Sequence, residues 1–149
     1  MELSEVRERL LEQHRRLRAG IAKLLCWKAG DARGELEFCV ALAELSDELA
    51  RHNQEEERLL SAVVPTLDAW GPVRKQLMDE HHVGEHAAQL RALRGLADGE
   101  LLQTGVDEAI ALAQRSLQKI LDHLDYEERE LLHPDLLRDD AYAIDMNAG

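Results

Sequence analysis

The chain has 149 residues, of which 45% are hydrophobic and 32% charged, and its formal net charge is −12. This length can bury a sizeable core, so we expect one domain over residues 1–149. The negative charge argues against a nucleic-acid partner, because phosphates would be repelled. The charged start of the chain predicts no signal peptide, and no run is long enough to span a membrane, so we expect a cytoplasmic protein without a membrane partner.

The first helix is predicted over about residues 2–28. Its hydrophobic residues recur at intervals of four and three, and His14 occupies one position of this stripe, which contains Val6, Leu10, Leu17, Ile21 and Leu24. Cys26 and Cys39 are the only cysteines, and we expect two buried thiols rather than a disulfide, because cytosolic disulfides are rare.

The second helix is predicted from about residue 32 or 35 to about residue 64, with Pro65 marking its end. His52 and Glu56 are one helical turn apart, so their side chains leave the same face. That face is also the hydrophobic face, which consists of Phe38, Leu42, Leu45, Leu49, His52, Glu56, Leu59 and Val63.

The third helix is predicted from Pro72, a residue suited to the first helical position, to about Ala97. His82 and His86 share one face of it, together with Leu77 or Met78. We expect a single uninterrupted helix here.

The fourth helix is predicted to begin after Thr104, a candidate N-cap, and to end before Pro134. Glu127 falls in its hydrophobic stripe and His123 lies beside it; the stripe consists of Val106, Ile110, Ala113, Leu117, Ile120, Leu124, Glu127 and Leu131. The remainder, 135–149, is expected to be a tail outside a core of about residues 5–134.

Four helices of roughly 25 residues with short connections predict an all-α fold, an up-down-up-down antiparallel four-helix bundle. In such a bundle the hydrophobic faces meet, and seven polar residues lie on or beside these faces: His14, His52, Glu56, His82, His86, His123 and Glu127. Each histidine alone is more simply read as a core residue. The seven residues together need another explanation. A buried carboxylate without a partner costs several kcal/mol, and the basic residues that could pair with it mostly lie outside these hydrophobic stripes.

A metal centre would satisfy all seven side chains at once. Seven ligands are too many for one tetrahedral zinc ion. They fit two ions, bridged by Glu56, Glu127 and an oxo or hydroxo group, with one coordination position left open. Mixed imidazole and carboxylate coordination suits iron, and we expect two iron ions.

At this point the chain resembles the hemerythrin-like (HHE cation-binding) family. The order is His14, then His52-x-x-x-Glu56, then His82-x-x-x-His86, then His123-x-x-x-Glu127. The resemblance implies a four-helix bundle with a non-haem di-iron centre. It implies that His82, His86 and His123 hold one iron and His14 and His52 the other, with Glu56 and Glu127 bridging. The ferritin-type alternative needs two Glu-x-x-His units, and only Glu130-x-x-His133 fits.

Two assignments have alternatives. Glu128 would match a spacing of five residues after His123, but Glu127 lies on the leucine face and is preferred. His81 could replace His82 by pairing with Glu85, but His82 with His86 keeps two imidazoles and is favoured. The neighbouring acidic residues are interpreted as solvated: Glu55, Glu57, Glu128 and Glu130.

The resemblance implies that dioxygen, nitric oxide or peroxide binds at the open iron position, and we expect oxygen binding, storage or sensing. The alternatives are an oxidoreductase that acts on peroxide or nitric oxide, or a protein for iron handling or iron–sulphur repair. The sequence leaves open whether the protein is an enzyme, although no additional acid or base is evident beside the site.

Overall fold

The structure is a computed structural model that describes residues 2–28, 32–66, 71–100 and 105–133. Within these ranges it does not describe the side chains of residues 32, 33, 66, 81–83, 99, 100 and 106. All secondary structure in the described part of the chain is helical, which confirms the all-α prediction there. Thr104, Pro134 and the predicted tail 135–149 lie outside the described residues.

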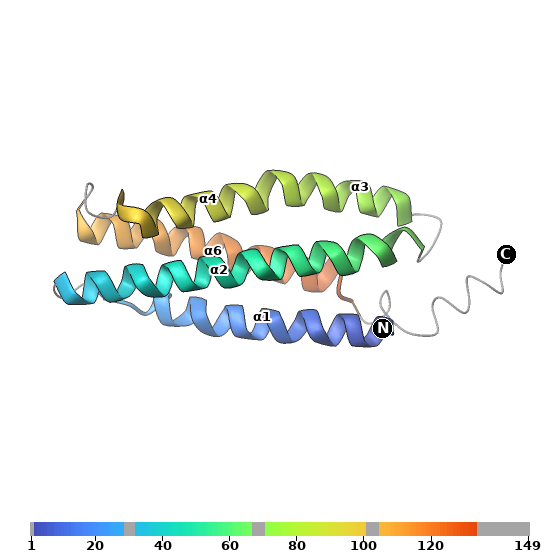
Figure 1. The fold of residues 1–149 in the computed structure, drawn as a ribbon, viewed down its shortest axis with the longest axis horizontal. Coiled ribbons are helices and arrows are strands. Elements are labelled where there is room, and N and C mark those ends of the chain that lie inside the picture. The colour runs from blue at the N-terminus through green and yellow to red at the C-terminus, as the bar shows by residue number, and fades with distance from the viewer. Residues whose placement is uncertain (1, 29–31, 67–70, 101–104, 134–149) are drawn as a thin grey trace.

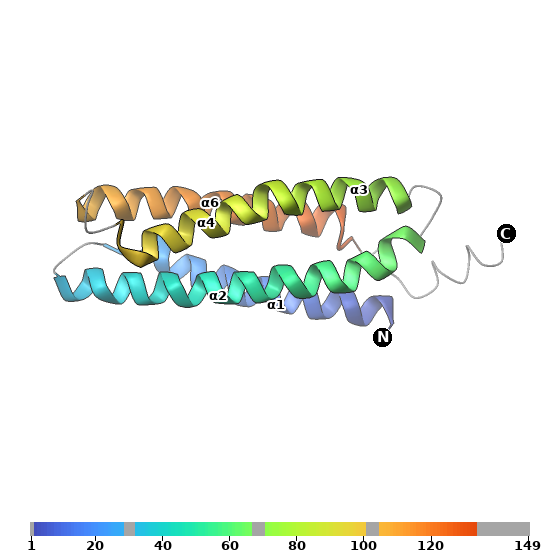
Figure 2. The ribbon, with the colours of Figure 1, turned by 45° about the horizontal axis from the view of Figure 1, so that its top comes forward.

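The helices form a bundle of rods that lie side by side (Figures 1 and 2). The first rod is α1, and the second is α2 followed by the 3₁₀ turn η1. The third rod joins α3, η2, α4 and η3, and the fourth is α6. Their bounds are α1 Leu3–Leu25, α2 Ala32–Val63, η1 Val64–Thr66, α3 Gly71–His81, η2 His82–His86, α4 Ala87–Gly95, η3 Leu96–Glu100 and α6 Val106–Glu130. α1 and α4 each pack against both α2 and α6.

The third rod differs from the predicted uninterrupted α-helix. η2 and η3 are π-helical, so the backbone hydrogen bonds there span five residues instead of four. The hydrophobic face of α3 is carried by Met78, which is buried, whereas Leu77 is exposed. The π-helical segment η2 contains both His82 and His86, and it therefore alters the register between the two predicted ligands.

Local chemistry explains where several helices begin. α1 starts with the Glu2 N–H donating to the Glu5 carboxylate at 3.0 Å. At the start of α3, a Cβ on Gly71 would lie 2.5 Å from the carbonyl oxygen of Val64, so only glycine allows this close approach. The N-cap of α6 is Gly105, whose φ of 89° favours glycine. The predicted cap at Thr104 was therefore one residue too early.

The cysteine prediction was wrong in one respect. Both cysteines are free, as expected, but Cys26 is exposed and Cys39 is only partly buried. Burial and the carboxylate of Glu35 raise the pKa of the Cys39 thiol. Among the described residues, no helix has the length and apolar character that crossing a membrane requires.

Two hydrophobic clusters fill the bundle, and the polar residues lie between them. In α1, Leu10 belongs to one cluster and Leu17 to the other, with His14 between. Along α2 the order is reversed, because Leu49 belongs to the same cluster as Leu17 and Leu59 to the same cluster as Leu10. In α6, Leu124 again belongs to the cluster of Leu17. The candidate site is therefore a polar layer between two apolar regions, which separates it from the ends of the bundle.

Candidate metal centre

The first group of donor atoms lies between α1 and α2. His14, His52 and Glu56 are almost completely buried, with exposed fractions of 0%, 3% and 0%. The Nε2 atoms of the two imidazoles lie 3.1 Å apart. Glu56 Oε2 lies 3.0 Å from His52 Nε2 and 3.6 Å from His14 Nε2. The one-turn spacing of His52 and Glu56 brings both to the face that His14 approaches from the neighbouring helix.

The second group lies between η2 and α6. His86 ends η2, and His123 and Glu127 come from one turn of α6. His86 Nε2 contacts His123 Nε2, which also contacts Glu127 Oε1. His86 Nε2 lies 3.2 Å from the same carboxylate oxygen. All three side chains are buried.

Glu127 joins the two groups, because its two oxygens face different imidazoles. Oε1 contacts His86 and His123, whereas Oε2 lies 3.6 Å from His14 Nε2. The ligand atoms of His14, His52, Glu56 and Glu127 all lie within 4.8 Å of one another, as do those of His86, His123 and Glu127. A carboxylate placed in this way can bridge two cations.

The structure thus brings six of the seven predicted residues into one connected cluster. The seventh, His82, lies in η2, but its side chain and that of His81 are outside the described side chains. The prediction for His82 therefore stays a prediction.

Glu128 lies behind His14 instead of inside the cluster. Its Oε1 is 3.6 Å from His14 Nδ1, and its other oxygen accepts a hydrogen bond from Arg18, which also binds Asp125 at 2.7 Å. Glu128 is 31% exposed and Glu55 23% exposed, so these two of the four neighbouring acidic residues are partly buried and paired instead of fully solvated. The geometry places Glu127 between the imidazoles and Glu128 outside them.

Two further residues contact the outward nitrogens of the imidazoles. Gln13 Oε1 lies 2.7 Å from His52 Nδ1, and Glu85 Oε2 lies 3.7 Å from His123 Nδ1. Sequence reasoning missed the role of Gln13. Its only signal in the sequence is its position next to His14, because the contact depends on how α1 is rotated against α2.

The buried charges of the cluster shift the pKa values of three of its residues. Burial lowers the pKa of His14, but the carboxylates of Glu127 and Glu56 outweigh burial and raise this pKa to about 9. Burial and the neighbouring Glu127 raise the pKa of Glu56, yet His14 and His52 hold it below its ordinary value. Burial also raises the pKa of Glu127, but surrounding hydrogen bonds, three of them with imidazoles, keep it well below that value.

The donors present fit metal ions. Ligand atoms about 2.1 Å from one ion and at right angles to each other lie roughly 3.0 Å apart. The separations around His52 Nε2, 3.0 and 3.1 Å, match that value. Two imidazole nitrogens facing each other can share one proton, whereas a cation would accept the lone pairs of both. Buried carboxylates and imidazoles together form the mixed nitrogen and oxygen ligand set that suits transition metals.

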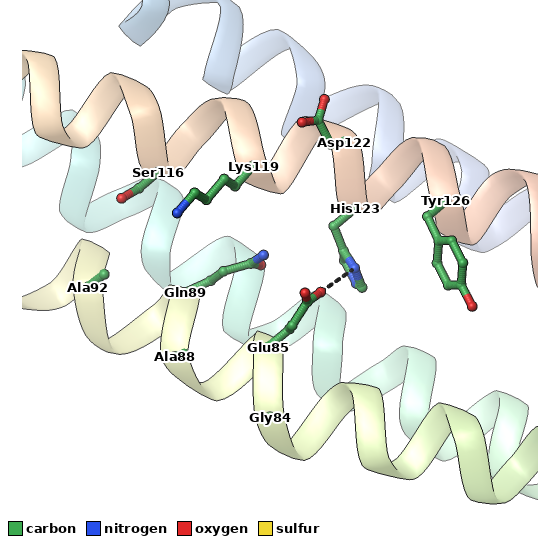
Figure 3. A pocket seen from close by; sticks show the side chains of 10 residues that line it. All are labelled: Gly84, Glu85, Ala88, Gln89, Ala92, Ser116, Lys119, Asp122, His123 and Tyr126. Carbon is green, nitrogen blue, oxygen red and sulfur yellow. Dashed lines mark ion pairs between the residues drawn. The ribbon is translucent and has the colours of Figure 1, made fainter.

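An open pocket of about 580 Å³ reaches the cluster between the third rod and α6. Figure 3 shows His123 pointing from α6 toward Glu85, with Tyr126 beside it. Small residues, Gly84, Ala88 and Ala92, line the opposite wall. Tyr126 is 41% exposed and lies at the edge of the bundle.

Six leucines near the site along the helices are all buried: Leu10, Leu17, Leu45, Leu49, Leu59 and Leu124. They belong to the two hydrophobic clusters on either side of the polar layer. Such a lining keeps water away from the donors on both sides along the bundle axis.

Comparison with known protein families gives one match. Residues 5–137 match the model of the hemerythrin HHE cation binding domain. Searches of curated proteins and of solved structures found no match.

Proposed function

The chain belongs to the hemerythrin HHE cation-binding family, and from this we propose that it is a non-haem di-iron protein that binds dioxygen, or nitric oxide or peroxide, at an open iron position. The observation that carries the proposal is the carboxylate of Glu127, whose two oxygens face two separate groups of imidazoles. This arrangement supports two ions rather than one.

We assign the ligands according to these groups. His14 and His52 would hold one iron, and His86 and His123 the other, with His82 completing the second set. Glu56 and Glu127 would bridge, together with an oxo or hydroxo group. Because η2 alters the register, His81→Ala is the matched comparison for His82→Ala: we expect loss of iron only in His82→Ala, measured by metal analysis.

A pair of ferrous ions at these donors would supply two electrons and an open coordination position for the small molecule. The chain itself supplies the rest. The imidazoles and carboxylates orient the ions, and the flanking leucines exclude water and proton donors that promote loss of the bound molecule. The pocket beside His123 offers a route from solvent.

The remaining parts of the proposal rest on the sequence. We propose a single domain, with the four rods in up-down-up-down antiparallel order, as expected from short connections between helices. The acidic chain would act in the cytoplasm on a small molecule, without nucleic acid as partner.

Metal analysis and the visible spectrum of aerobically purified protein test the di-iron proposal. We expect iron to be the main metal and a charge-transfer band to be present. Iron-free protein that also fails to take up ferrous ions would contradict it.

Mixing the di-ferrous protein with oxygen then tests the activity. A stable band that disappears under vacuum supports reversible binding. Rapid irreversible oxidation with turnover of added peroxide would instead show an oxidoreductase.

A further inference from the structure

Gln13 on α1 connects His52 to a charged pair on the surface of the bundle. Its Oε1 lies 2.7 Å from His52 Nδ1, and its Nε2 donates to Glu55 Oε2 at 2.9 Å. Glu55 is in turn paired with Arg9 and lies 3.9 Å from Arg58. These contacts lead from Glu55 on α2 to Gln13 on α1, and from Gln13 back to the buried imidazole of His52 on α2.

The direction of these hydrogen bonds follows from the chemistry of each group. The carboxylate of Glu55, held beside arginines, can only accept hydrogen bonds. The amide NH₂ of Gln13 must therefore face Glu55, which leaves the amide oxygen facing His52. An amide oxygen also only accepts, so His52 Nδ1 must carry the proton and donate it.

This protonation determines what the other nitrogen of His52 can do. With the proton on Nδ1, a neutral imidazole has its lone pair on Nε2. Nε2 is the atom that faces His14 and Glu56, at 3.1 and 3.0 Å. The opposite tautomer would donate its N–H to Glu56 Oε2 but would leave two acceptors facing each other at Gln13, so Gln13 and Glu56 favour opposite tautomers of His52.

We propose that Gln13 is a positioning residue that fixes the Nδ1–H tautomer and the ring orientation of His52, so that its Nε2 lone pair is presented to a metal ion. The metal part rests on the proposed function; the tautomer part does not. Partners of this kind on metal-binding histidines commonly account for about 10- to 100-fold in metal affinity.

Two other outward contacts in the cluster are longer. Glu128 lies 3.6 Å from His14 Nδ1 and Glu85 lies 3.7 Å from His123 Nδ1, both beyond ordinary hydrogen-bond distance. Among these three contacts, only that of Gln13 has the length of a hydrogen bond, so its removal is expected to have the largest effect on a ring tautomer.

Nitrogen NMR of the histidine rings in metal-free protein tests the tautomer directly. The expected result is a His52 ring with Nδ1–H in the wild type, and a shift toward Nε2–H in Gln13→Leu. Gln13→Glu keeps an acceptor and should retain Nδ1–H. Gln76→Leu is the matched control, because Gln76 donates to Glu80 on the surface of α3, away from the cluster. An unchanged His52 tautomer in Gln13→Leu overturns the proposal; Gln13→Ala repeats the test if the leucine variant does not fold.

Anaerobic titration with ferrous ions tests the second part. We expect Gln13→Leu to weaken binding by about 10- to 100-fold and Gln76→Leu to leave it unchanged. A changed tautomer with unchanged affinity overturns the positioning role. Wild-type protein that shows Nδ1–H but takes up no metal overturns the proposed function and leaves the tautomer assignment in place.

Discussion

Glu127 and Glu128 are adjacent on α6 but have different surroundings, and their burial decides which of the two is the candidate metal ligand. The Glu127 side chain is 1% exposed and faces imidazoles on both sides, whereas that of Glu128 is 31% exposed and binds Arg18. The hydrophobic stripe of the sequence already favoured Glu127, because helical periodicity places it among leucines. The pairing of Glu128 with Arg18 joins residues on α6 and α1, so it could not be read from either helix alone.

We expect Glu127→Ala to remove both metal ions, because its two oxygens face both groups of imidazoles. Glu128→Ala should keep the metal content, with only a modest loss of affinity through His14. Metal analysis of the two purified variants after identical loading measures this. Equal loss in both would contradict the placement of Glu127 as the shared ligand.

The raised pKa of His14 predicts how metal-free protein responds to pH. Protonated His14 stabilises the folded state fully below its ordinary pKa of 6.5, and this stabilisation is lost as the pH rises through about 9. The lowered pKa values of Glu56 and Glu127 add stability above their ordinary value of 4.5, which is lost as the pH falls below it. We therefore expect the highest Tm of chelator-treated protein between pH 4.5 and 6.5.

The alkaline loss is on the order of 3 kcal/mol, because one pKa unit corresponds to about 1.4 kcal/mol. Thermal unfolding of chelator-treated protein across this pH range measures it. In His14→Gln the alkaline decline should be much smaller. A decline of the same size in this variant would show that other groups cause it.

At the scale of elements, the four rods and their buried faces were predictable because each has a regular hydrophobic period. The interruptions of the third rod were not. A π-helical segment adds one residue to a turn without a distinct sequence signal, and η2 carries a predicted ligand at each end, His82 and His86. Periodicity takes an α-helix for granted there, so it could predict that His82 and His86 are both ligands but not how the two side chains are oriented relative to each other.

Two glycine substitutions test how closely the start of α3 packs against η1. Gly71→Ala should destabilise the protein by about 1–3 kcal/mol, because the new Cβ would lie 2.5 Å from the Val64 carbonyl oxygen and force η1 and α3 apart. Gly84→Ala is the matched control: it has open space around it, and alanine favours a helix by about 0.5–1 kcal/mol. Urea unfolding midpoints compare the two. Similar midpoints for both variants would contradict the close contact at Gly71.

For the whole molecule, the polar layer divides the apolar interior. Elsewhere the buried residues are almost all hydrophobic, but in the layer two buried carboxylates and four buried imidazoles meet. Without a metal, protons must supply the positive charge, as the raised pKa of His14 indicates. The sequence predicted that such a layer exists, because it placed these residues on buried faces of every rod. It could not predict that the layer separates two clusters, since that depends on how the rods are aligned.

Metal binding should therefore stabilise the entire bundle, because the donors come from α1, α2, η2 and α6 and the intact site exists only when all are packed. We expect ferrous ions, added without oxygen to metal-free protein, to raise the Tm with concentration. The gain would be about 4 kcal/mol when free metal is a thousandfold above Kd. Magnesium should have little effect, because it prefers oxygen ligands. His52→Ala and Glu56→Ala should lose iron content and this gain together. A rise in Tm of equal size in these variants would show that iron stabilises the protein from another site.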